Sequence, residues 1–109
     1  MKIIKTLQLP NGKSPFKDWL IKLNPKTKIK ILEYVNRLSF GGSKKNIKSV
    51  GDGLFELKIN FGAGYRVYFV ETEKIIILII SGGDKSTQIS DIKKAKEHWR
   101  KYALQNKLI

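Results

Sequence analysis

Residues 53–88 read GLFELKINFGAGYRVYFVETEKIIILIISGGDKSTQ. Apolar and polar side chains alternate through the first part of this stretch, which is the period of a half-buried β-strand. A glycine-rich turn, a second alternating run and a polar turn follow, and then comes a run that is apolar on both faces. The stretch therefore predicts three consecutive strands, at residues 54–61, 65–70 and 75–80.

The first two of these strands are predicted to pair through a three-residue turn at residues 62–64, where two glycines tolerate positive φ. This turn predicts three core pairs across the hairpin, which are Phe61 with Tyr65, Ile59 with Val67, and Leu57 with Phe69. Because side chains alternate along a strand, the opposite face of the hairpin is polar. Its members are Glu56, Lys58, Arg66 and Tyr68.

The chain before this stretch predicts a strand and a helical hairpin. Residues 2–9 are expected to form the strand. Ser14 and Asn24 each precede a proline, which is the N-cap and first-position pattern of a helix. The buried stripe of the second helix is predicted to be Ile29, Leu32 and Val35, with Leu38 beside them. Residues 43–52 are predicted to form a polar loop.

The chain after this stretch predicts a final helix, with Ser86 or Thr87 as its N-cap. Its apolar stripe is predicted to be Ile92, Ala95, Trp99 and Tyr102. Ile77 and Ile79 need a cover, for which this helix and a partner chain are the two candidates. The elements together predict an α+β fold in a single domain that covers residues 1–109.

Composition narrows the chemistry. The chain of 109 residues has no cysteine and a single histidine, His98, which excludes a disulfide scaffold, a thiol nucleophile and cysteine-based or multi-histidine metal sites. We therefore expect no metal and no cofactor. The N-terminal residues lack the apolar segment of a signal peptide, and the longest apolar run, residues 75–80, is too short to span a membrane. We expect a cytoplasmic protein without a membrane partner.

The formal net charge is +13, from 22 basic and 9 acidic residues, which is typical of a domain that binds a polyanion. A lysine-rich genome is the alternative explanation for the lysine count. Residues 1–50 carry 12 of the basic residues, whereas residues 51–83 carry only 3. The sheet therefore holds few charges at defined positions, and the helical parts supply diffuse attraction.

The charged groups of the sheet suit RNA cleavage without a metal, in which the 2′-hydroxyl attacks its own 3′-phosphate. Glu56 is a candidate base and Arg66 a candidate bidentate ligand for phosphate oxygens. Lys58 and Lys85 are candidates to add charge or donate a proton, and Tyr68 to stack on a base. The lysines of the polar loop are further candidates to bind RNA, and they are Lys44, Lys45 and Lys48.

Each of these residues also has a structural explanation. Glu56 and Lys58 form an ordinary solvated face in the simplest interpretation, and a tyrosine such as Tyr68 is more often a packing residue. Arg66 is the most specific signal, because it is one of three arginines among 22 basic residues and follows a Gly-Tyr turn. The glycines at 82 and 83 resemble a phosphate cradle, but the Walker spacing is absent.

Three segments, 54–59, 64–69 and 82–88, together with Asp91 and Ile92, resemble the bacterial RelE/ParE toxin superfamily. Within it, the chain resembles the addiction module killer protein group and is similar to HigB and phage Gp49-like toxins. The resemblance implies a RelE-like fold, with an antiparallel four-stranded sheet, an N-terminal helical hairpin on one face and a C-terminal helix. It also implies a cognate antitoxin, which we expect to be a helix-turn-helix protein encoded by the adjacent gene.

The resemblance assigns Lys58 and Arg66 to two cations of the nuclease members, and Lys85 to a third that is usually arginine. Glu56 lies where many members have a basic residue, and Asp91 lies nearest to a C-terminal tyrosine or histidine used in cleavage. RelE-like members cut mRNA on the ribosome, whereas ParE-like members inhibit DNA gyrase. We therefore expect a ribosome-dependent mRNA endonuclease, with a gyrase inhibitor and a non-catalytic nucleic-acid-binding module as alternatives.

Overall fold

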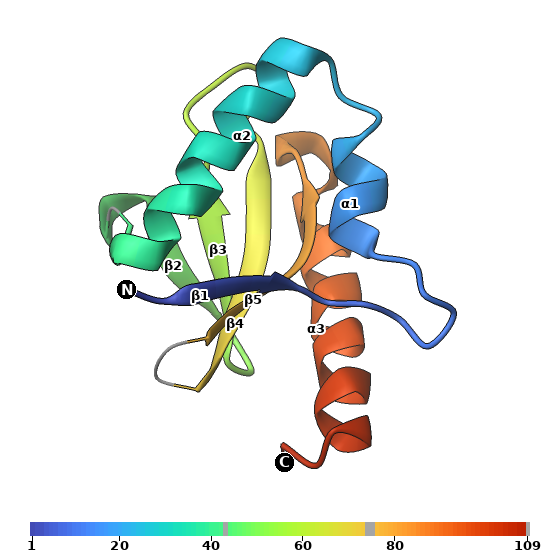
Figure 1. Cartoon of the computed structure of the whole chain (residues 1–109). Coiled ribbons are helices and arrows are strands. Elements are labelled where there is room, and N and C mark those ends of the chain that lie inside the picture. Colours follow the sequence, from blue (N-terminus) through green and yellow to red (C-terminus); the bar gives the residue numbers. More distant parts are fainter. Residues whose placement is uncertain (43, 74–75, 109) are drawn as a thin grey trace.

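The computed structural model describes residues 1–42, 44–73 and 76–108, without the side chain of Lys44. One sheet has the strand order β1-β5-β4-β3-β2. Its strands are β1 (Ile3–Thr6), β2 (Ile47–Gly51), β3 (Leu54–Lys58), β4 (Arg66–Glu73) and β5 (Ile76–Gly83). In Figure 1, α1 and α2 lie above β1, and α3 runs down past the sheet to the C-terminus. The chain is thus an α+β protein with helices against both faces of a twisted sheet.

The expectation of four antiparallel strands is wrong in two respects. The sheet has five strands, and β1 runs parallel to β5, with Ile4 opposite Ile77. The additional strand, β2, lies within residues 43–52, which the sequence predicts to be a loop. β2 is an edge strand with exposed Lys48 and Ser49, so it carries the polar side chains that edge strands use against aggregation.

The pairing of β3 with β4 differs from the predicted register by two residues. Leu57 lies opposite Val67 and Phe55 opposite Phe69, and residues 59–65 connect the two strands. The predicted three-residue turn is therefore wrong. A shift of two residues keeps every side chain on its predicted face, because the period of a strand is two.

The first core lies between the sheet and the helical hairpin of α1 (Pro15–Leu20) and α2 (Pro25–Arg37). The predicted caps are confirmed: Ser14 Oγ accepts a hydrogen bond from Lys17 N at 3.3 Å, and Asn24 Oδ1 accepts one from Thr27 N at 2.9 Å. Proline follows each cap at the first helical position, where its missing N–H costs nothing.

The predicted stripe of α2 is largely wrong. Val35 and Leu38 are buried as expected, but Ile31 fills the centre of the core, while Ile29 is 60% exposed and Leu32 is also exposed. The helix packs with a spacing of four residues through Ile31 and Val35, and this spacing turns Ile29 and Leu32 to the outside. A lysine-rich helix with five apolar positions offers two possible stripes, and contact with the sheet selects one of them.

The second core lies on the other face of the sheet, beneath α3 (Gln88–Gln105). A short 3₁₀ turn, η3 (Lys85–Thr87), precedes this helix. The predicted stripe of this helix is confirmed, since its four residues pack against the core that contains Leu54, Val70, Leu78 and Ile80. The expectation that the last helix covers Ile77 and Ile79 is wrong, because both pack under the helical hairpin.

The cap before the last helix is also more elaborate than predicted. Thr87 is the N-cap of α3 but makes no side-chain capping bond there, and Asp84 instead caps η3, accepting a hydrogen bond from Ser86 N at 2.8 Å.

Among the described residues, no helix is long and apolar enough to cross a membrane.

Candidate functional site

The polar face of the β3–β4 hairpin forms as predicted, although its pairs are different. Glu56 lies directly opposite Tyr68, and Lys58 lies opposite Arg66. The next strand adds Gly83 opposite Arg66. One carboxylate, one phenol and two cations therefore come from adjacent positions on the same side of the sheet.

This face is buried by the first turns of α3, which the sequence analysis did not anticipate. Glu56 is 2% exposed, Arg66 7% and Tyr68 0%, whereas Lys58 is exposed. Lys58, at the end of the face where β3 stops and β4 starts, is therefore accessible to a ligand. Arg66 keeps a small exposed fraction, whereas Glu56 and Tyr68 are closed off.

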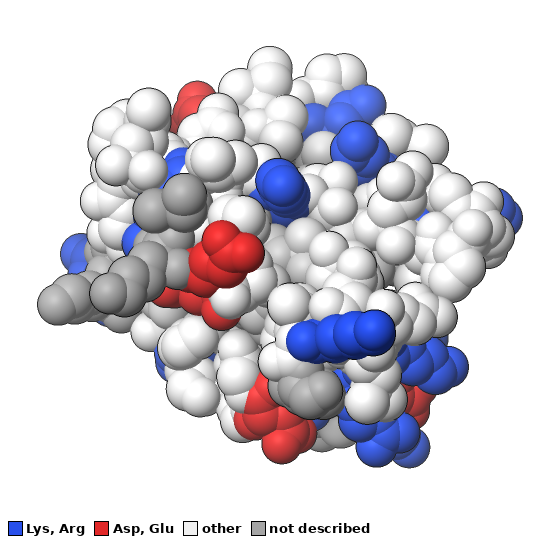
Figure 2. All heavy atoms as spheres, turned by 60° about the horizontal axis from the view of Figure 1, so that its bottom comes forward, with Lys and Arg blue, Asp and Glu red and all other residues white. Residues whose placement is uncertain are grey.

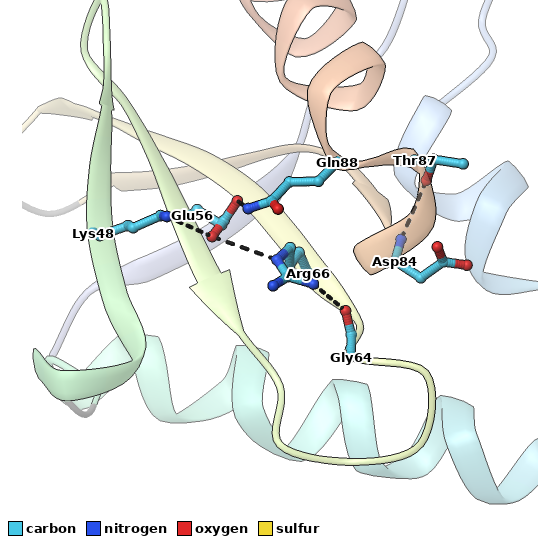
Figure 3. Close-up of polar contacts among 7 residues, drawn as sticks. All are labelled: Lys48, Glu56, Gly64, Arg66, Asp84, Thr87 and Gln88. Carbon is cyan, nitrogen blue, oxygen red and sulfur yellow. Dashed lines mark hydrogen bonds and ion pairs between the residues drawn. The ribbon is translucent and has the colours of Figure 1, made fainter.

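The carboxylate of Glu56 has three polar neighbours from three different elements (Figure 3). Gln88 Nε2, at the start of α3, donates a hydrogen bond to Glu56 Oε2 at 2.8 Å. Glu56 Oε1 lies 3.6 Å from Arg66 Nε and 3.8 Å from Lys48 Nζ. These neighbours offset the cost of burying a charged carboxylate, and Gln88 ties α3 to the sheet at this point.

Arg66 is held from two sides of its guanidinium group (Figure 3). Nη1 donates a hydrogen bond to the carbonyl oxygen of Gly64 at 2.6 Å, and Nε faces the carboxylate of Glu56. The distance from Nε to Glu56 is too long for a hydrogen bond, so within the described part of the chain Nε has no hydrogen-bond partner. The guanidinium is thus fixed in orientation but keeps unused donor capacity.

Lys85 joins this group through the turn at Gly64. A Cβ atom built on Gly64 would lie 3.4 Å from Arg66 Nη1 and 3.4 Å from Lys85 Cβ, so both side chains flank the same glycine. Gly64 has φ +73°, a conformation that a residue with a side chain rarely adopts. The structure therefore brings three predicted site residues together at one end of the sheet: Lys58, Arg66 and Lys85.

Tyr68 is a core residue in this structure. Its ring belongs to the second core, and its hydroxyl is buried without a hydrogen-bond partner among the described residues. Burial raises the pKa of Tyr68 well above its usual value, and the nearby carboxylates of Glu56 and Asp91 raise it further. Tyr68 is therefore a neutral phenol, and in this conformation it is not available to stack on an RNA base.

The two glycines that resemble a phosphate cradle are required for packing. Both lie in β5, where a Cβ on Gly82 would come within 2.3 Å of the Trp19 ring and a Cβ on Gly83 would overlap the Asp91 carboxylate. Asp91 accepts a hydrogen bond from Thr87 Oγ1. The absence of side chains at 82 and 83 thus lets α1 and α3 approach the sheet from opposite faces.

The predicted RNA-binding lysines lie at the start of the β2 edge. Lys45 is exposed in the 3₁₀ turn η2 (Lys44–Asn46), and Lys48 is exposed on β2, while the side chain of Lys44 lies outside the described part of the structure. The face shown in Figure 2 carries basic and acidic side chains with uncharged ones between them. Positive charge on this face is thus dispersed, so a binding site for an anion has to be sought in local groups of basic side chains and not in the net charge of the chain.

Metal-ligand residues are not grouped in the described residues, where no three His, Cys, Asp or Glu side chains come close enough to hold an ion. His98 lies half-buried on α3, far along the helix from Gln88. Burial lowers the pKa of His98 below its usual 6.5, and the nearby Lys101 lowers it further.

Comparison with known proteins shows similarity to a protein family and to a bacterial protein. The family model described as Phage derived protein Gp49-like (DUF891) matches residues 18–107. A protein of Haemophilus influenzae (strain ATCC 51907 / DSM 11121 / KW20 / Rd), whose name is "Uncharacterized protein", is 50% identical over 82 residues. The aligned region covers 74% of this chain and 82% of the relative.

Proposed function

Because the chain belongs to the phage-derived Gp49-like family, which is a family of RelE/HigB-like toxins, we propose that it is the toxin of a type II toxin–antitoxin pair and cleaves mRNA on the ribosome. One observation carries this proposal. Lys58, Arg66 and Lys85 gather at the open end of the β3–β4 face, and the guanidinium of Arg66 is oriented by Glu56 and Gly64.

The proposed reaction needs no metal and no cofactor. The 2′-hydroxyl of a ribose gives its proton to a base, for which Glu56 is the candidate, and its oxygen attacks the adjacent phosphorus; where Glu56 only orients Arg66, a water molecule takes that proton. The bond from phosphorus to the 5′-oxygen breaks, and the products are a 2′,3′-cyclic phosphate and a 5′-hydroxyl. Arg66 binds the non-bridging oxygens, whose negative charge grows in the transition state. Lys58 and Lys85 add positive charge, and one of them donates the proton that the leaving 5′-oxygen takes up.

Glu56 has two possible roles in this scheme. The sequence predicts a general base that removes the proton of the 2′-hydroxyl, and that role stays a prediction. Burial of its carboxylate, with Gln88, Arg66 and Lys48 around it, favours a second role, in which Glu56 orients Arg66. The variant Glu56→Gln distinguishes the two roles. If Glu56 is the base, the variant loses the limb of the pH–rate profile that reports its deprotonation; if Glu56 orients Arg66, the variant binds phosphate more weakly.

The proposed partners are the ribosome with its mRNA, in the cytoplasm, and an antitoxin encoded by the adjacent gene. Ile29 and Leu32 are exposed on the outer face of α2 amid lysines. That face suits an acidic antitoxin segment with apolar anchor residues. An antitoxin bound there would leave the cations at Lys58 and Arg66 uncovered, so inhibition would require a second contact near Lys85.

A gyrase inhibitor is the second candidate function. It is favoured by the burial of Glu56 and Tyr68, since inhibition by binding requires neither a base nor a stacking ring to be accessible. A non-catalytic RNA-binding protein is compatible with the same burial and with the net charge of +13.

The functions are distinguished by inducing the protein in bacteria and mapping new RNA 5′ ends. Cleavage of translated mRNA is expected with the natural chain and is expected to disappear with Arg66→Ala. Arg37→Ala is the matched control, because Arg37 stacks on the Tyr34 ring 5.0 Å away and lies outside the site. Growth arrest with intact transcripts and trapped gyrase–DNA complexes would support the second candidate instead.

A further inference from the structure

A groove of about 490 Å³ lies along α3, away from the three clustered cations. Its lining residues are Asp52, Lys93, Lys96, Glu97, Trp99 and Arg100. We propose that this α3 groove binds a single-stranded segment of RNA beside the segment that is cleaved. The inference rests on the proposed function for the identity of its ligand, but its binding test does not depend on cleavage.

The turn between β2 and β3 forms one wall of the groove. Gly51, the last residue of β2, and the turn residues Asp52 and Gly53 all have positive φ, and this segment contacts α3. A Cβ on Gly51 would lie 3.2 Å from Lys96 Nζ, and one on Gly53 would lie 3.8 Å from the Trp99 indole nitrogen. Asp52 also pairs with Lys96 at 3.5 Å. One wall of the groove is therefore formed by a backbone turn that contacts α3.

The lining combines an aromatic ring with cations. Trp99 is half-buried, and Tyr102 stacks against it with ring centroids 6.3 Å apart, so the indole is held in place. Asp52 is occupied by Lys96, whereas Lys93 and Arg100 make no ion pair within the described residues. An ordered aromatic ring beside free cations is the combination with which proteins bind single strands, by base stacking and phosphate contact.

The groove lies further along the helix whose first residue contacts the Arg66 site. Gln88 contacts Glu56 at the start of α3, and Trp99 follows eleven residues later, about 16 Å along the axis at 1.5 Å per residue. Lys93 lies midway between them. Lys48, which is exposed on the edge strand β2, also faces the carboxylate of Glu56. A short RNA strand with one phosphate at Arg66 is thus led past cations toward the indole ring of Trp99.

The test measures binding of a short single-stranded RNA that carries 2′-O-methyl groups and so resists cleavage. The groove variant is Lys93→Ala with Arg100→Ala, and the control is Lys94→Ala with Lys101→Ala, which removes the same charge from α3 outside the groove lining. All four substituted residues are exposed, so both variants are expected to fold.

The groove variant is expected to weaken binding on the order of tenfold and to reduce the salt slope by about 1.4, which is two phosphate contacts on a single strand. The control is expected to weaken binding less than threefold. Trp99→Phe keeps a stacking ring and is expected to remove fluorescence quenching by RNA while it preserves most of the affinity. Equal losses in groove and control variants, or RNA binding without quenching of Trp99, would overturn the inference.

Cleavage of unmodified RNA by the same variants separates the two proposals. If the natural chain binds RNA through the groove but never cuts it, the proposed function fails and the groove assignment stands. If the groove variant cuts and binds RNA as well as the natural chain does, the groove assignment fails and the proposed function stands.

Discussion

The ion pair between Glu56 and Arg66 gives the sharpest test of how the site is built. Glu56→Gln keeps the size of the side chain and an oxygen that can accept from Gln88, but it removes the charge that faces Arg66 Nε at 3.6 Å. Arg66 is then buried with the Gly64 carbonyl as its remaining close partner. Removing one member of a buried pair costs about 3–5 kcal/mol.

Two features of this site reduce that figure. The Arg66 pair is longer than a hydrogen bond, and Lys48, the second cation at Glu56, is mostly exposed to water. We therefore expect Glu56→Gln to lower the free energy of unfolding by about 2 kcal/mol. Arg66→Met alone is expected to cost a similar amount, because the buried Glu56 then keeps a neutral hydrogen-bond donor, Gln88, and one solvated lysine but no buried cation.

Urea denaturation of both single variants and the double variant measures the coupling. The double variant Glu56→Gln with Arg66→Met is expected to be more stable than the sum of the single losses predicts, by about 1–2 kcal/mol, because neither charge is left unpaired. Strict additivity, or a loss below about 0.5 kcal/mol for Glu56→Gln, would refute the reasoning that Glu56 orients Arg66.

Three further predictions concern packing and pH. Gly83→Ala is expected to destabilise the protein by about 3 kcal/mol or more in urea denaturation, because the new methyl group overlaps the Asp91 carboxylate, and Gly83→Ala with Asp91→Ala should recover part of the loss. Ile31→Ala is expected to cost about 2–5 kcal/mol, whereas Ile29→Ala should stay within about 0.5 kcal/mol, and equal losses would show that α2 faces the sheet differently. The pKa of His98 is lower in the folded protein than its usual 6.5, so as the pH falls below 6.5 the unfolded chain takes up a proton before the folded chain does. The free energy of unfolding should therefore decline below that pH. His98→Gln should make this decline shallower in denaturation curves measured at successive pH values.

Alternation along the strands allowed the faces of the β3–β4 hairpin to be predicted from sequence. Phe55 and Leu57 face the helical hairpin as expected, and the polar residues face the other way. The register was not predictable to the same degree, because a shift of two residues leaves all faces unchanged and only the geometry of residues 59–65 decides it. β2 was missed because its two apolar residues, Ile47 and Val50, are too few for a periodic signal.

Burial of the polar face was the main feature that sequence reasoning missed. Glu56 and Arg66 look like solvated residues in the alternating pattern, yet the same face continues into Val70. Val70 and the apolar stripe of α3 both have to be buried against another element. The two together could have indicated that α3 packs on this face of the sheet. Gln88 is the last residue of a segment that carries the family resemblance, but nothing in the sequence assigned it a role, because that role depends on a contact with a residue 32 positions away.

The proposed cleavage of RNA by Arg66 and its neighbouring lysines can be measured on ribosomes stalled on a defined mRNA. The purified protein is added with a chelator present, and the ends of the products are analysed. We expect fragments with 2′,3′-cyclic phosphate and 5′-hydroxyl ends, produced by the natural chain and by Arg37→Ala but not by Arg66→Ala. Intact mRNA with the natural chain, or equal cleavage by Arg66→Ala, would contradict it.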